Sequence, residues 1–314
     1  MNDVAPLNRA RTLADASADD RRIHYRTVTV GSLEIFYREA GLGHVPTILL
    51  LHGFPTSSHM FRDLIPLLAE RFHVVAPDYP GFGYSSCPSV DVFDYTFDRL
   101  TDVVEGFTQA VGLTSYALYC QDYGGPVGFR LAIRHPERVT ALLIQNANAY
   151  KDGVTELFQD VVLRLWTERT PETEAKVRTL FELPITKKQY LEGVEEPTLV
   201  SPDAWTHAQW GMDRPGNKDV QYVLQANYGS NVERYDEWHA YFREHRPPTL
   251  VMWGKDDFVF AEAGAHAYKR DLPDAEVHVL NAGHFALETH APEIAAAIRA
   301  FLARVAERHA GGGI

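Results

Sequence analysis

Short apolar runs alternate with segments of helical periodicity in the first half of the chain. Residues 46–51 read PTILLL, a continuous apolar run typical of a strand that is buried on both faces. Residues 96–111 instead place Leu100, Val103 and Phe107 at helical spacing, on one face. This alternation of strand and helix predicts βαβ units and a mainly parallel sheet.

The same pattern predicts eight strands in the chain and five helices outside residues 148–245. The strands are expected at residues 26–30, 33–38, 46–51, 73–76, 115–120, 139–145, 248–253 and 276–280. The helices are expected at residues 57–70, 96–111, 124–134, 261–270 and 291–308. Gly31 and Ser32, between the first two strands, indicate a hairpin.

The strand pattern stops between residues 148 and 245. This segment contains many helical stretches but no clear strand. We therefore predict an α/β core made of residues 25–147 and 246–310, which carries an inserted helical cap at residues 148–245. Residues 1–24 are polar and are expected to form an N-terminal leader.

Composition and charge narrow the class of protein. With 314 residues, of which 45% are hydrophobic, the chain is long enough to bury a sizeable core. The net charge of −12 disfavours binding to nucleic acid or to an anionic membrane. Cys87 and Cys120 are too few for a disulfide framework, and the histidines lack the spacing of a zinc site. No apolar run suits a membrane span or a secretory signal, so we expect a cytoplasmic protein without a bound metal.

Residues with catalytic chemistry follow four of the predicted strands. In doubly wound sheets, ligands bind at the carboxyl ends of the strands. The motif HGFP follows the third strand at 52–55, CQDYGG ends the fifth at 120–125, GKDD follows the seventh at 254–257, and NAGHF follows the eighth at 281–285. The chain thus presents a nucleophile candidate, an acid and a histidine, in that order.

These motifs and their order resemble the α/β-hydrolases with an aspartate nucleophile, the epoxide hydrolases and haloalkane dehalogenases. Asp122 stands where the serine of a GxSxG motif would stand, with the small residues Cys120 and Gly124 two positions away on each side. The resemblance covers about residues 26–308. It implies an α/β-hydrolase fold, which is a mostly parallel doubly wound sheet with an inserted helical cap.

An aspartate nucleophile restricts the reaction. Attack on an ester or amide carbonyl would give an anhydride, whereas attack on a saturated carbon gives a stable alkyl-enzyme ester. The resemblance implies that Asp122 is the nucleophile, His284 the base that activates water, and Asp257 the acid that orients His284. It also implies that the backbone N–H groups of Phe54 and Tyr123 form the oxyanion hole.

Two neighbouring carboxylates compete for the acid position. Asp256 and Asp257 both follow the seventh predicted strand, and the G-x-x-D arrangement of the family favours Asp257. Some dehalogenases carry this acid after the sixth strand instead. Residues 145–148 read QNAN and offer no carboxylate there.

The leaving group distinguishes epoxide hydrolases from haloalkane dehalogenases. Haloalkane dehalogenases typically bind the halide with a Trp directly after the nucleophile and with a second donor, which is an Asn after HG or a Trp in the cap. This chain has Tyr123 directly after the nucleophile and Phe54 after HG. An epoxide leaves as an alkoxide, which cap tyrosines usually protonate. The ANYGSN motif around Tyr228 resembles one such tyrosine site. For the other we expect Tyr190, with Tyr150 as an alternative.

The sequence therefore predicts a hydrolase that acts through an aspartyl alkyl-enzyme ester, with an epoxide hydrolase that yields a vicinal diol as the first interpretation. A haloalkane dehalogenase and a non-enzymatic protein that binds small apolar ligands are the alternatives. We expect a small apolar substrate, water as the second reactant, and no cofactor. The pocket is expected between core and cap, with a lining that includes Phe54, Tyr123, Trp166 and Phe285.

Overall fold

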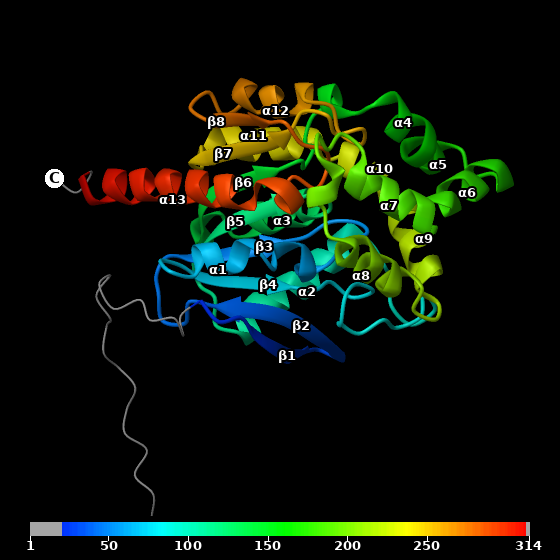
Figure 1. Cartoon of the computed structure of the whole chain (residues 1–314), viewed down its shortest axis with the longest axis horizontal. Helices are drawn as coiled ribbons and strands as arrows, with labels where there is room; N and C mark the ends of the chain where they lie inside the picture. The colour runs from blue at the N-terminus through cyan, green and yellow to red at the C-terminus, as the bar shows by residue number, and fades with distance from the viewer. Residues whose placement is uncertain (1–20, 312–314) are drawn as a thin grey trace, which may run out of the picture.

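One eight-stranded sheet organises the computed structural model, which describes residues 21–311 (Figure 1). The spatial order of the strands is β1-β2-β4-β3-β5-β6-β7-β8. Strand β2 pairs antiparallel with β1 and β4, and all other neighbours are parallel. The predicted mostly parallel sheet is thus confirmed. Its strands are β1 (His24–Val30), β2 (Leu33–Ala40), β3 (Thr47–Leu51), β4 (His73–Pro77), β5 (Tyr116–Gln121), β6 (Val139–Gln145), β7 (Thr249–Gly254) and β8 (Glu276–Leu280).

Helices cover both faces of the sheet, which explains the continuous apolar runs of the central strands. Every residue of β3 is buried. Leu49 and Leu51 belong to the hydrophobic cluster on one face, while Ile48 and Leu50 belong to the cluster on the other. The first face carries α2 (Phe97–Ala110), α3 (Gly124–Arg134), α11 (Tyr235–His245) and α12 (Ala263–Ala267), and the second carries α1 (Leu64–Leu68) and α13 (Leu287–Gly311).

The predicted helix 57–70 is interrupted. A 3-10 turn, η1 (Ser58–Phe61), precedes the short helix α1. Pro66 has no N–H with which to bond the carbonyl of Arg62, so one continuous α-helix would lack a hydrogen bond at this point. Among the described residues, no helix has both the length and the apolar character needed to cross a bilayer.

The chain between β6 and β7 is helical and contributes no strand to the sheet. Its helices α4 to α10 lie together at one end of the sheet, on the right in Figure 1. Helix α11, by contrast, packs on α3, where the rings of Phe129 and Trp238 lie 5.1 Å apart. The helices of this insertion are η3 (Lys151–Gly153), α4 (Glu156–Phe158), the π-helical turn η4 (Gln159–Leu163), α5 (Arg164–Thr167), α6 (Pro171–Arg178), η5 (Thr179–Phe181), α7 (Leu183–Leu191), η6 (Pro197–Leu199), α8 (Pro202–Met212), α9 (Asn217–Asn227) and α10 (Gly229–Val232).

The ends of the chain differ slightly from the prediction. Residues 1–20 of the predicted leader lie outside the described residues. Strand β1 already begins at His24, the last residue assigned to that leader.

Candidate active site

Asp122 occupies a sharp turn between β5 and α3. Its φ of 48° is in the left-handed region, which few non-glycine residues adopt. Helix α3 begins two residues later at Gly124, where a Cβ atom would collide with the carbonyl oxygen of Leu51. The small residue predicted at this position is therefore required by the close approach of β3. The turn lifts the Asp122 side chain out of the sheet and towards a cavity.

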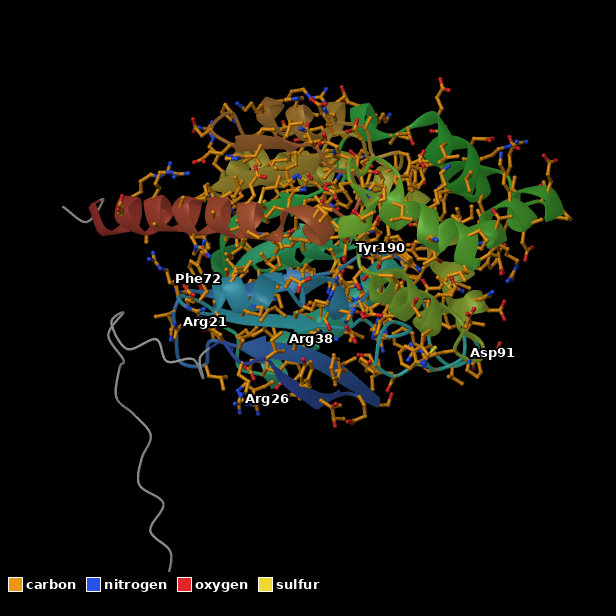
Figure 2. The ribbon with its side chains drawn as sticks, in the orientation of Figure 1. Arg21, Arg26, Arg38, Phe72, Asp91 and Tyr190 are labelled. Atoms are coloured by element: carbon orange, nitrogen blue, oxygen red, sulfur yellow. The ribbon has the colours of Figure 1, made fainter. Side chains whose placement is uncertain are left out.

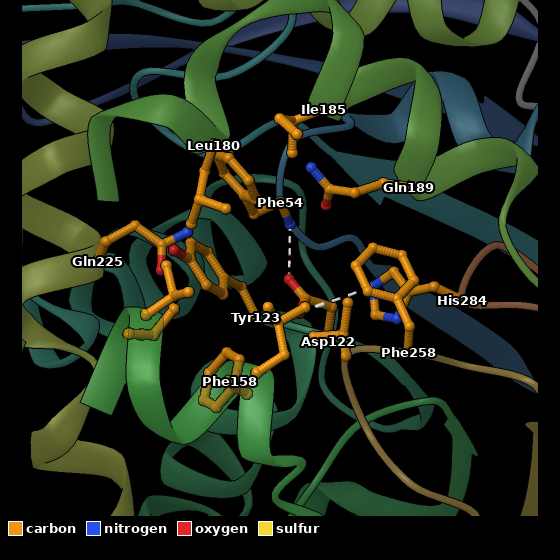
Figure 3. A pocket seen from close by; sticks show the side chains of 14 residues that line it. Phe54, Asp122, Tyr123, Phe158, Leu180, Ile185, Gln189, Gln225, Phe258 and His284 are labelled. Atoms are coloured by element: carbon orange, nitrogen blue, oxygen red, sulfur yellow. Dashed lines mark hydrogen bonds and ion pairs between the residues drawn. The ribbon is translucent and has the colours of Figure 1, made fainter. Parts of the chain in front are cut away.

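Backbone N–H groups hold the carboxylate of Asp122. The N–H of Phe54 donates to Oδ1 at 2.6 Å (Figure 3), and the N–H of Tyr123 also donates to the carboxylate. Burial raises the pKa of Asp122 above its usual value, although His284 and the two N–H groups oppose this rise. The two predicted oxyanion donors thus point at the same carboxylate.

His284 links the carboxylates of Asp122 and Asp257. Its Nδ1 lies 2.8 Å from Asp257 Oδ2, and its Nε2 lies 3.8 Å from Asp122 Oδ2. Burial alone would lower the pKa of His284, but the two carboxylates outweigh it and raise the pKa. A neutral imidazole that donates from Nδ1 to Asp257 presents a lone pair at Nε2. Asp256, the competing acid, is exposed and its backbone N–H bonds Ala282, away from the imidazole.

Two side chains that the sequence analysis did not assign support this arrangement. Asn146, just after β6, donates to Asp257 Oδ2 at 2.8 Å and accepts from the N–H of Gly254 at 3.0 Å. Gln121, the last residue of β5, places its amide nitrogen 3.1 Å from Nε2 of His284. Both residues stand at the carboxyl ends of buried strands, and this position was the signal that could have identified them.

A cavity opens next to Asp122 and His284 (Figure 3). Helices of the β6–β7 insertion cover it, and most of its wall is apolar. Its lining consists of Phe54, Asp122, Tyr123, Leu157, Phe158, Val161, Val162, Leu180, Ile185, Gln189, Gln225, Phe258, Val259 and His284.

Trp166 and Phe285, both expected in the lining, lie outside it. The Trp166 indole is 39% exposed on α5, covers Gly229 and donates to Glu233 at 3.2 Å. Phe285 turns away from the cavity and stacks on Tyr190, with the ring centroids 4.2 Å apart. Both aromatic side chains therefore serve packing.

The two tyrosines expected to protonate an alkoxide are also absent from the lining. Tyr190 lies beside the start of α13 (Figure 2). Successive residues of a helix are rotated by about 100°. Because Gln189 of α7 lines the cavity, the next residue, Tyr190, points away from it. Tyr228 packs behind the wall, with its ring 4.8 Å from Phe158 and 6.0 Å from Tyr123. These side-chain directions correct the expectation for both tyrosines.

Tyr123 lines the cavity and carries a buried hydroxyl group. This hydroxyl has no hydrogen-bond partner among residues 21–311. Burial, and then the charge of Asp122, raise the pKa of Tyr123 well above its usual value. The hydroxyl therefore keeps its proton at neutral pH.

Comparison with known proteins shows the family to which the chain belongs. Residues 46–291 match the family model described as the alpha/beta hydrolase fold. The uncharacterized hydrolase YNR064C of Saccharomyces cerevisiae is 40% identical over 277 residues, which cover 87% of this chain and 94% of the relative. Haloalkane dehalogenase 2 of Mycobacterium tuberculosis is 42% identical over 112 residues, 36% of this chain and 38% of the relative.

A solved structure shows the same fold over nearly the whole chain. The haloalkane dehalogenase DbeA from Bradyrhizobium elkani superposes with a TM-score of 0.77 at 23% identity, covering 91% of this chain and 99% of its own. The protein belongs to the α/β-hydrolase fold family, and it is a hydrolase.

Proposed function

We propose that this protein hydrolyses substrates at a saturated carbon through a covalent ester on Asp122, and that these substrates are epoxides. One observation carries the proposal. Asp122 Oδ1 is held by a backbone N–H, while Oδ2 lies 3.8 Å from His284 Nε2, next to a largely apolar cavity. A carboxylate in this setting suits attack on carbon followed by hydrolysis of the ester.

The first step forms the ester. Asp122 Oδ2 attacks a ring carbon of the epoxide, and the bond from that carbon to the ring oxygen breaks. The oxygen leaves with the electron pair and takes the proton of the Tyr123 hydroxyl. The Tyr123 hydroxyl takes the role of proton donor that was expected of the cap tyrosines. Because the pKa of Tyr123 is high, this hydroxyl is protonated before the reaction begins.

The second step releases a vicinal diol. His284 Nε2 takes a proton from water, and the resulting hydroxide attacks Cγ of the Asp122 ester. The N–H of Phe54, which already bonds Oδ1, and the N–H of Tyr123 stabilise the oxyanion that forms on Asp122. When the ester bond breaks, the leaving alkoxide takes the proton from His284. The carboxylic acid of Asp122 then returns its proton to the Tyr123 phenolate.

Haloalkane dehalogenation is the second candidate, because named haloalkane dehalogenases are among the relatives. A halide needs hydrogen-bond donors but no proton. The Tyr123 hydroxyl would then act only as a donor, and the hydrolysis of the ester would be the same. The non-enzymatic interpretation differs from both candidates because it predicts no ester on Asp122.

A paired turnover assay tests these alternatives. The protein is given styrene oxide and a bromoalkane, and the release of diol and of halide is followed alongside an Asp122→Ala variant. Diol formation that requires Asp122 supports the proposal. Halide release without diol formation would instead support haloalkane dehalogenation. If neither product forms and mass spectrometry detects no adduct on Asp122, the aspartyl mechanism is wrong.

Tyr123→Phe separates the two leaving groups further. Loss of a general acid slows a reaction by about 10²- to 10⁴-fold. We expect a loss of this size in the formation of the ester from an epoxide. The hydrolysis of an ester already formed should change little, since Tyr123 supplies only a backbone N–H to that step.

A further inference from the structure

Two glutamine side chains interrupt the apolar wall of the cavity. Gln189 of α7 and Gln225 of α9 both line it and are 6% and 3% exposed. The amide nitrogen of Gln189 and the amide oxygen of Gln225 have no hydrogen-bond partner in the described part of the chain. In Figure 3, Gln189 lies on the side of His284, and Gln225 lies on the side of Tyr123.

A neighbouring glutamine outside the cavity has both ends of its amide paired. Gln209 of α8 accepts from the hydroxyl of Thr186 at 2.7 Å and donates to Asp213 Oδ1 at 2.9 Å. Burying an unpaired amide group is unfavourable. Two unpaired amides that face one cavity therefore indicate that a ligand completes their hydrogen bonds.

We propose that Gln189 and Gln225 select substrates that carry a polar substituent besides the reacting carbon. This inference rests on the proposed function. The amide nitrogen of Gln189 donates to an acceptor oxygen, and the amide oxygen of Gln225 accepts from a hydroxyl or an N–H. A hydroxyl-bearing epoxide offers both kinds of group, and the remaining apolar wall binds its carbon chain.

Matched substrates measure this selectivity. Propylene oxide is compared with glycidol, and epoxyhexane with its terminal-hydroxyl analogue. We expect kcat/KM to favour the hydroxyl-bearing member of at least one pair by roughly tenfold, the value of one recovered hydrogen bond. In Gln189→Leu or Gln225→Leu this preference should disappear, because a leucine cannot bind the hydroxyl.

Ile185→Val is the matched control. Ile185 lines the same cavity on the same helix as Gln189 but has no polar atom in its side chain. Its substitution should change the rates on both members of a pair by the same factor. If one leucine variant fails to fold, the other still tests the preference, and equal kcat/KM values within both pairs in the unmodified protein would overturn the assignment without any variant.

The outcomes separate the two proposals. Equal kcat/KM within both pairs would overturn the assignment of Gln189 and Gln225 and leave the hydrolysis of epoxides standing. A preference for the hydroxyl-bearing epoxide that survives both leucine substitutions would also overturn it. If no epoxide is hydrolysed and Asp122 is never alkylated, the proposed function fails, and this inference fails with it.

Discussion

Replacing Asp257 with Asn should slow the second chemical step far more than the first. The Asp257 side chain is fully buried and bonds His284 Nδ1 at 2.8 Å. In Asp257→Asn, the new amide would donate to Nδ1 and shift the imidazole proton to Nε2. Nε2 would then be unable to accept a proton from water, although Asp122 would keep its N–H donors and its attack on carbon.

The size of the effect follows from the loss of the base. General-base catalysis contributes about 10²- to 10⁴-fold to the rate of a step. A loss of this size is therefore expected in ester hydrolysis. The N–H of Val259 donates to Oδ1 and should hold the oxygen of the new amide there, which places the amide nitrogen at Oδ2, facing Nδ1, at the cost of the bond from Asn146.

Rapid-mixing experiments with mass detection resolve the two steps. The ester on Asp122 should form at nearly the original rate and then persist, so that turnover stops after about one equivalent of product or adduct. Asp256→Asn is the matched control, because this neighbour is exposed and, in the described part of the chain, its backbone N–H bonds Ala282 and not His284. Its turnover should stay close to that of the unmodified protein.

The reasoning would be refuted by one pattern of results. If Asp257→Asn hydrolyses the ester within a few-fold of the original rate, Asp257 does not orient the base. If Asp256→Asn is the variant that accumulates the ester, the acid has been assigned to the wrong residue.

Three further predictions concern the base, acid stability and the turn at Asp122. His284→Gln should form the Asp122 ester and fail to hydrolyse it, so intact-mass measurement should find a stoichiometric adduct; undiminished turnover would mean that another group activates water. Burial lowers the pKa of His59 to about 3 and that of His207 to about 4, so both are neutral in the folded protein. Below pH 6.5 the two histidines bind protons in the unfolded chain but stay neutral in the folded protein, so stability is lost as the pH falls from 6.5 towards 3. Tm should therefore drop over this range. The drop should be smaller in a variant with both histidines replaced by Gln. Gly124→Ala should lower the free energy of unfolding in urea by about 1–3 kcal/mol through overpacking against β3, whereas Gly211→Ala, which meets no atom closer than 3.9 Å, should not destabilise by this mechanism.

Much of the fold was predictable because its signals are local. Central strands buried on both faces require continuous apolar runs, and β3 and β5 have them. The predicted helix 57–70 was wrong in its continuity, since the apolar pattern outweighed the proline within it. A proline at position 66 was visible in the sequence, and its missing N–H gives the physical reason for the interruption.

The residues around the reacting atoms were predictable for a related reason. Asp122, Asp257 and His284 each lie within four residues after the end of a strand, and a parallel sheet brings the carboxyl ends of its strands to one edge. Hydrogen bonds across that edge were less visible. Asn146 follows a strand as Asp122 does. The role of its amide, a hydrogen bond of 2.8 Å to Asp257, can be recognised only when β6 and β7 are seen to lie side by side.

The sequence by itself determined the sheet, the turn at Asp122 and the order of the groups around it, because strand burial and tight turns depend on residues that are neighbours in the chain. Only the tertiary structure decided which side chains of the insertion face the cavity. Gln189 and Tyr190 are adjacent in the chain, yet the packing of α7 turns the amide inward and stacks the phenol on Phe285. The rotation of a helix about its axis is set by everything that packs on it, and a local motif does not encode it.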